Sequence, residues 1–168
     1  MDITVRTETK ADIDAIDALI SAAFQTAEHS SGTEQQIVRA LRNSGQLTVS
    51  LVAETGGGIV GHVAASPVTV SDGTSGWYGI GPVAVLPAWQ GRGIGSQLMK
   101  RCLEALRTLD AGGCVLLGSP DYYRRFGFHP QPGLTLPGVP AEYFMALPFQ
   151  TPIPQGAVSY DSAFSVSP

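Results

Sequence analysis

Apolar positions in the first 45 residues predict one short strand followed by two helices. Residues 3–6 alternate apolar and polar side chains, as a strand with one buried face does. Apolar side chains then recur every three or four residues, at Ile13, Ile16, Ile20 and Phe24. This spacing marks one face of a helix that begins after Thr9. A polar loop, residues 25–32, leads to a second helix that begins at Thr33 and stops at Gly45.

Strands dominate the middle of the chain. Glycine-containing turns separate three predicted strands, at residues 47–54, 59–70 and 77–85. A helix follows from Ile94 to Leu109, because its apolar residues again repeat at helical spacing. The apolar run from Cys114 to Leu117 does not alternate, which is typical of a central strand buried on both faces.

The last third of the chain is rich in proline. We expect a short helix over residues 122–126 and a strand that opens at Phe128. Eight of the twelve prolines follow that residue, so the remainder should be mostly loop, with one further strand at residues 143–147. This order of elements predicts an α/β fold, a mixed sheet with helices on both faces. The length of 168 fits one domain, in which residues 131–168 form a proline-rich extension packed on the core.

Composition narrows the class of protein. Apolar residues make up 43% of the chain, too many for a disordered protein. The net charge of −4 argues against nucleic acid as a partner, and no apolar run approaches the ~18 residues of a membrane span. The N-terminus lacks the features of a signal peptide, and two cysteines, Cys102 and Cys114, cannot form a metal cluster. We therefore expect a cytoplasmic protein without a metal, nucleic-acid or membrane partner; a homodimer is compatible with the sequence.

The predicted strand at residues 77–85 has an unusual composition. It contains two glycines and a proline, at Gly79, Gly81 and Pro82. Proline cannot donate a ladder hydrogen bond, and glycine in a strand often marks a bulge. Part of this strand should therefore lack a protein partner on one side. Its free backbone groups could pair with an extended ligand that carries amides.

A glycine-rich turn, residues 90–96, follows that strand and opens a helix. Glycines let the backbone approach a ligand closely, and the N–H groups at a helix N-terminus bind anions. Arg92 adds a positive charge, and residues 92–125 hold six basic residues against three acidic ones. We interpret the turn as a pyrophosphate cradle; a purely structural turn is the alternative. The spacing of Gly91, Gly93 and Gly95 does not complete a dinucleotide-binding fingerprint, and the P-loop lysine is absent.

A second motif lies about thirty residues further on. Residues 118–128 combine a turn, two adjacent tyrosines and a Gly-Phe exit. Adjacent side chains on a helix point roughly 100° apart, so Tyr122 and Tyr123 face different surroundings. One can face the core while the other faces a cleft.

Together these features resemble the GNAT-type N-acetyltransferase superfamily, whose members transfer an acetyl group from acetyl-coenzyme A to an amine. The coenzyme loop of that family has the form Q/R-x-x-G-x-G/A, which Gln90, Gly93 and Gly95 match. Its Y-x-x-x-G-F motif is matched from Tyr123 to Phe128. The order of elements extends the resemblance over residues 1–130.

The resemblance implies roles for particular residues. The Gly-His-Val-Ala segment at residues 61–64 and the tyrosine motif are similar to one bacterial branch of predicted N-acetyltransferases. Tyr123 would stand near the thioester sulfur as the general acid. The strand backbone would hydrogen-bond the pantetheine arm, at Val83, Ala84 and Val85. The loop backbone would bind the pyrophosphate, at Gln90, Gly91, Arg92, Gly93, Ile94, Gly95 and Ser96.

The general base cannot be carried over in the same way. Many family members have a glutamate on the strand that corresponds to residues 77–85, and this strand has no acidic residue. The remaining candidates are Glu54, His62, Asp121 and a chain of water molecules. Each side chain also has a plainer interpretation: Glu54 as an exposed hairpin residue, His62 as a structural histidine, and Asp121 as the N-cap of the tyrosine helix.

The acceptor is the least defined partner. In this superfamily its site forms from the loop at residues 25–32 and from late strands, here near Glu142 and Tyr143. Acidic and basic side chains lie in or beside that loop, at Glu28, His29 and Glu34. Acidic residues favour a cationic amine, carried by a small molecule or a peptide, although a solvated loop is the plainer interpretation.

Three function classes follow from these motifs. The first is an acetyl-CoA-dependent N-acetyltransferase, which the presence of Tyr123 favours. The second is a non-catalytic acyl-CoA-binding sensor or interaction module, which the missing strand glutamate favours. The third is a nucleotide-binding oxidoreductase, against which the glycine spacing argues.

Overall fold

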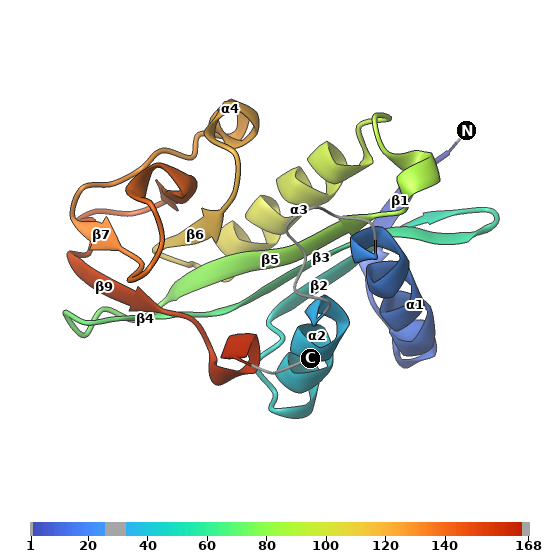
Figure 1. Cartoon of the computed structure of the whole chain (residues 1–168), viewed down its shortest axis with the longest axis horizontal. Helices are drawn as coiled ribbons and strands as arrows, with labels where there is room; N and C mark the ends of the chain where they lie inside the picture. The colour runs from blue at the N-terminus through green and yellow to red at the C-terminus, as the bar shows by residue number, and fades with distance from the viewer. Residues whose placement is uncertain (1, 26–32, 166–168) are drawn as a thin grey trace.

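A six-stranded mixed sheet forms the centre of the molecule (Figure 1). The computed structural model describes residues 2–25 and 33–165. The strand order is β1-β2-β3-β5-β6-β8, and neighbours are antiparallel except for β5 and β6. The strands of this sheet are β1 Thr4–Thr7, β2 Val49–Thr55, β3 Gly58–Pro67, β5 Trp77–Val85, β6 Gly113–Leu117 and β8 Phe144–Pro148. A smaller sheet, ordered β4-β9-β7, contains β4 Thr69–Val70, β7 Leu134–Thr135 and β9 Gly156–Ser159.

Helices cover both faces of the central sheet, which confirms the predicted α/β fold (Figure 1). One face carries α1 (Ile13–Phe24) and α2 (Glu34–Asn43), and the other carries α3 (Ile94–Thr108). The short helices are η1 Lys10–Asp12, η2 Pro87–Trp89, α4 Pro120–Tyr123, η3 Arg124–Phe126, η4 Ala141–Tyr143 and η5 Ser162–Ser165. In the part of the chain that the structure describes, no helix is both long enough and apolar enough to cross a membrane.

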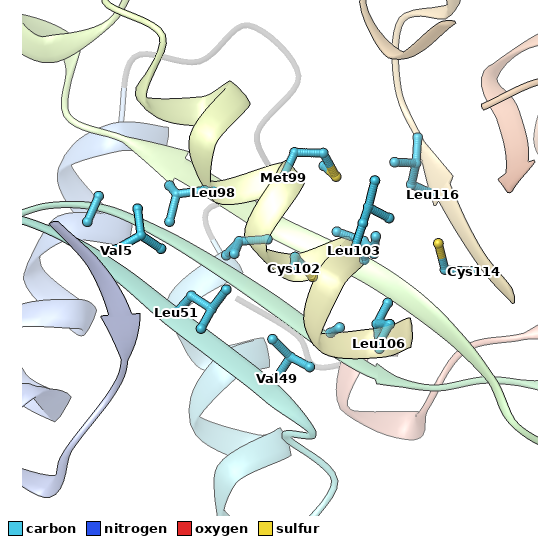
Figure 2. Packing of buried hydrophobic residues seen from close by; sticks show 14 of the residues in the cluster. Val5, Val49, Leu51, Leu98, Met99, Cys102, Leu103, Leu106, Cys114 and Leu116 are labelled. Carbon is cyan, nitrogen blue, oxygen red and sulfur yellow. The ribbon is translucent and has the colours of Figure 1, made fainter. Parts of the chain in front are cut away.

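The alternation of side chains along β2 explains how one strand supports both helical layers. Leu51 belongs to the apolar cluster beneath α3, whereas its neighbour Val52 packs with Ile16 and Ile20 of α1. Figure 2 shows the α3 cluster gathered between this helix and the strands. This cluster also contains Cys102, a free and buried thiol whose pKa burial raises to about 12.

The central sheet splits between β5 and β6. These two strands pair only from Trp77 to Gly79, and β6 then turns away toward α4 (Figure 1). Among the described residues, no strand pairs with the rest of β5 on that side. The register with β3 shifts at Gly81 and Pro82, and Gly81 has a φ of 146° that favours glycine. The prediction that part of this strand lacks a partner is therefore confirmed.

Two sequence-based expectations were wrong, each near a proline. The strand expected at residues 59–70 ends at Pro67, and β4 then joins β9 in the smaller sheet. No strand opens at Phe128: only a single bridge joins His129 to Ala146, because Pro130 and Pro132 fix their own φ and Gln131 enters a turn in which its carbonyl oxygen accepts from the Leu134 N–H. The C-terminal part is mostly loop, as expected, and β8 matches the strand predicted at residues 143–147. It also contains two short strands that were not predicted, β7 and β9.

Candidate active site

The cradle, the glycine-rich turn at residues 90–96, borders a cavity of about 350 Å³. Gly91 and Gly93 have φ values of 79° and 81°, which side chains with a Cβ rarely adopt, and Gly93 is the N-cap of α3. The N-terminus of a 15-residue helix thus faces the cavity through exposed backbone. Most of the expected loop residues line it: Gln90, Gly91, Gly93, Ile94, Gly95 and Ser96, with Val85 from the end of β5.

The positive charge of this cavity comes from an arginine that sequence reasoning did not single out. Arg92 lies with its guanidinium carbon 4.9 Å from the centre of the Trp89 ring, and it lines a different cavity beside Asp2. Arg125 lines the cradle cavity instead. Its Nε donates a 3.0 Å hydrogen bond to the carbonyl oxygen of Tyr122, and its guanidinium stacks over the Tyr122 ring. The signal was present in the sequence, since Arg125 lies one turn after the first tyrosine.

A second cavity, which we call the cleft, has a volume of about 710 Å³. Its walls come from five separate parts of the chain and are mostly apolar. The lining residues are Phe24, Glu34, Ile37, Ile80, Gly81, Pro82, Val83, Leu116, Leu117, Gly118, Tyr123, Tyr160 and Phe164. The part of β5 that lacks a partner on the β6 side therefore runs from the cleft at Ile80 to the cradle at Val85.

The two adjacent tyrosines line different cavities. Tyr122 lines the cradle and Tyr123 lines the cleft, with their ring centres 4.9 Å apart in an edge-to-face arrangement. The Tyr123 ring lies against Gly118, where a Cβ would stand only 2.3 Å from the ring carbon Cε2. Burial, with a smaller contribution from Tyr122, raises the pKa of Tyr123 above its usual value of 10. The phenol is therefore held in its protonated form, as a general acid requires.

None of the three candidate bases lines the cleft. Arg6 donates two hydrogen bonds to the Glu54 carboxylate, at 3.2 and 3.1 Å, and lowers its pKa. Asp121 is exposed in the first turn of α4. The expectation that Asp121 caps this helix was wrong: Ser119 is the N-cap, because Pro120 supplies a favourable first helical residue.

His62 is fully buried and belongs to a polar network on the α1/α2 face. Ser50 donates its hydroxyl hydrogen to Glu8, so His62 Nε2 must donate to Ser50 Oγ, at 2.8 Å. Arg42 of α2 in turn donates to Glu8 at 2.8 and 3.1 Å. Burial lowers the pKa of His62 to about 4. The network ties α2 to the sheet, and it supports a structural role for this histidine.

The expected acceptor residues are distributed differently. Glu28 and His29 lie outside the described residues. Glu34 lines the cleft, at the start of α2. Glu142 and Tyr143 are exposed and do not line it; Tyr160 and Phe164, from the C-terminal part of the chain, do. Sequence reasoning missed these two aromatic residues because no local motif surrounds them.

The fold and the two cavities define a class of protein in which the open edge of a split α/β sheet joins a glycine-rich helix N-terminus to an apolar cleft, and comparison with known proteins identifies the family. Residues 46–130 match the model of the acetyltransferase (GNAT) domain. The "Uncharacterized N-acetyltransferase YhbS" of Escherichia coli strain K12 is 38% identical over 125 residues, which cover 74% of this chain and 72% of that protein. The chain thus belongs to the GNAT acetyltransferase family, and it is an acyltransferase by membership.

Two solved structures support the same conclusion. A GNAT family acetyltransferase from Brucella melitensis, crystallised with acetyl-CoA, is 45% identical with a TM-score of 0.87, covering 97% of this chain and 98% of that one. The YhbS protein of Escherichia coli, crystallised with CoA, is 32% identical with a TM-score of 0.88, covering 98% and 92%. The predicted family and fold are confirmed.

Proposed function

We propose that this protein transfers the acetyl group of acetyl-CoA to a primary amine by direct attack on the thioester. The observation that carries the proposal is the part of β5 that lacks a partner on the β6 side. It joins the glycine-rich cradle to the cleft that contains the phenol of Tyr123. The residues from Ile80 to Val85 span roughly 17 Å at the rise of a strand. The acetyl-CoA and CoA bound by the two relatives support the same ligand here.

Each part of the coenzyme meets a suitable group of this chain. The pyrophosphate binds the backbone N–H groups from Gln90 to Ser96, and the guanidinium of Arg125 supplies the nearby positive charge. The amides of the pantetheine arm pair with backbone groups of β5 on the side that lacks a strand, from Val83 to Val85, as an added strand would. There the carbonyl oxygen of Val85 also accepts a 3.1 Å hydrogen bond from Gln90 Nε2. The thioester then lies in the cleft beside Tyr123.

The reaction removes two protons from the attacking nitrogen, one before and one after it attacks, and supplies one proton to the sulfur. A free alkylamine has a pKa of about 10.4, so its ammonium form must lose a proton before it attacks. The amine nitrogen then bonds to the thioester carbonyl carbon, the C–S bond breaks, and the thiolate leaves with the electron pair. Tyr123 gives its phenolic proton to this sulfur, and the second proton that the nitrogen loses after the attack restores the phenol. Of the four candidates for the base, Glu54, His62 and Asp121 do not line the cleft, so among these we assign removal of the first proton to water.

The test has two stages. Acetyl-CoA should raise the melting temperature, whereas NADH should not; the reverse result would exclude the assignment of the cradle. Release of free thiol from acetyl-CoA is then followed with a panel of primary amines. Binding of acetyl-CoA without thiol release from any amine would favour a non-catalytic sensor module. The absence of an acidic residue on β5 is an argument for that class.

A further inference from the structure

The fork, the point where β5 and β6 separate, lies at one end of the cleft (Figure 1). The two strands pair for the last time between Gly79 and Val115. The next residue on each strand, Ile80 and Leu116, lines the cleft, and both side chains belong to the apolar cluster beneath α3. The fork is therefore an apolar end of the path along β5 that begins at the cradle.

The ring of Tyr160 lies on the backbone of β5 at this fork. Gly79 has no side chain, and a Cβ at this position would overlap ring atoms of Tyr160. The ring also stacks with Phe164, with ring centres 5.0 Å apart, and it packs against the apolar cluster that contains Val68 and Val115. Since Tyr160 lines the cleft as well, these contacts hold one fixed aromatic wall at the fork.

The two cavities set the direction of the coenzyme arm, provided that the arm lies along β5 as the proposed function requires. From the phosphate oxygen to the sulfur the arm has about twelve chain bonds, as many as roughly four residues of extended backbone. Counted from Val85 at the cradle, the sulfur then lies near Gly81, where a Cβ would meet nothing within 4 Å. The acyl group continues from the sulfur toward Ile80 and the ring of Tyr160.

We propose that Tyr160 sets the length of the acyl group that this acyltransferase accepts. An acetyl group fits between the sulfur and the ring. Each added methylene would overlap a ring that its neighbours hold in place, and overpacking of this kind is unfavourable. Burial raises the pKa of the Tyr160 phenol above its usual range, so the residue contributes shape and no charge. Tyr160 is thus a specificity-determining residue, and no proton transfer is assigned to it.

The first experiment measures binding, which needs no acceptor amine. Acetyl-CoA and butyryl-CoA are titrated into the wild-type protein by calorimetry. Butyryl-CoA, whose acyl group has two more methylenes, should bind at least about 10-fold more weakly. Tyr160→Leu should remove most of this difference, because the shorter side chain leaves room at the fork. Equal dissociation constants for the two ligands in the wild-type protein would overturn the proposal, whether or not any amine reacts.

Two controls separate the size of the side chain from other effects. Tyr160→Phe keeps the ring and should keep the wild-type ratio of the two dissociation constants. Tyr143→Leu makes the same exchange as Tyr160→Leu at an exposed residue outside the cleft, and it should change neither constant. The thermal shift with acetyl-CoA verifies that each variant is folded; Tyr160→Met takes the place of Tyr160→Leu if the latter does not fold. A ratio that changes in Tyr160→Phe, or that stays at the wild-type value in Tyr160→Leu, would overturn the assignment.

The second experiment measures thiol release with the primary amine that reacts fastest in the panel. The kcat/KM for butyryl-CoA relative to that for acetyl-CoA should rise about 10-fold or more in Tyr160→Leu. The same ratio in the wild-type protein and in this variant would contradict the role of Tyr160 while leaving the proposed function intact. Thiol release with none of the amines would instead contradict the proposed function, and the dissociation constants would still decide the role of Tyr160.

Discussion

The cradle and the cleft lie on either side of one pair of tyrosines, and they are built in different ways. The cradle consists of backbone from one continuous turn, with Tyr122 and Arg125 from the next motif. The cleft consists of side chains from both N-terminal helices, the split strands and the C-terminal segment. Backbone groups that bind a common phosphate ligand need only a local conformation. A specific acceptor needs side chains of chosen shape and charge, which several elements must supply together.

The largest effect is expected in the cleft, at the reacting atoms. Tyr123→Phe keeps the ring but removes the phenolic proton, so kcat should fall about 10²- to 10⁴-fold. Binding of acetyl-CoA should barely change, because the cradle does not involve this residue. Steady-state kinetics with thiol detection checks both points.

The neighbouring ring provides the comparison. Tyr122→Phe alters the other cavity and should leave kcat near the wild-type value. If Tyr122→Phe lowers kcat more than Tyr123→Phe, the two tyrosines have been assigned to the wrong cavities. If neither variant lowers kcat, the thiolate leaves without a proton from either residue.

The next effect concerns the cradle. A ligand at 100 times its dissociation constant adds about 2.7 kcal/mol to the free energy of unfolding. Gly93→Asp should abolish the acetyl-CoA thermal shift, because it places a carboxylate in the anion site at a φ of 81°. Gly73→Asp is the matched control: its φ is 89°, its Cβ would also meet open space, and it lies in the turn between β4 and β5. A shift that survives in Gly93→Asp would place the coenzyme elsewhere.

A smaller effect tests how α2, which carries part of the cleft wall, is held to the sheet. His62 has a folded-state pKa of about 4, below its ordinary value of 6.5, so the unfolded chain takes up a proton first as the pH falls. The free energy of unfolding should therefore decrease by about 2 kcal/mol between about pH 7.5 and about pH 5.

Urea unfolding at several pH values measures this change, and His62→Gln is the variant that isolates it. The variant cannot titrate in this range, so its stability should depend less on pH by the same amount. An unchanged pH dependence in His62→Gln would assign the titration to another group.

The smallest effect separates Arg125 from Arg92. Arg125→Gln should raise the KM for acetyl-CoA about 2- to 5-fold, a modest change because the side chain is exposed. Arg92→Gln should change this KM less, since its guanidinium lies over Trp89 and lines a different cavity. The opposite order would mean that Arg92 turns toward the coenzyme when it binds.

The sequence by itself was sufficient for the features that depend on local conformation. The bounds of β5 matched the predicted strand at residues 77–85, and its glycines and proline correctly indicated a region without a partner on one side. The glycine-rich turn and the start of α3 at Ile94 were also predicted. In each case the relevant signal lies within a few residues, because φ preferences and missing N–H groups act locally.

Only the tertiary structure decided which distant residues share a cavity. Tyr160 and Phe164 reach the cleft because β9 joins the smaller sheet and η5 then packs on α2, an arrangement that no spacing in the sequence indicates. In the structure, Arg125 rather than the side chain of Arg92 lines the cradle. His62 lies in a buried hydrogen-bond network instead of the cleft. Side-chain direction and burial depend on packing between elements, so the acceptor half of the site could not be derived from local patterns alone.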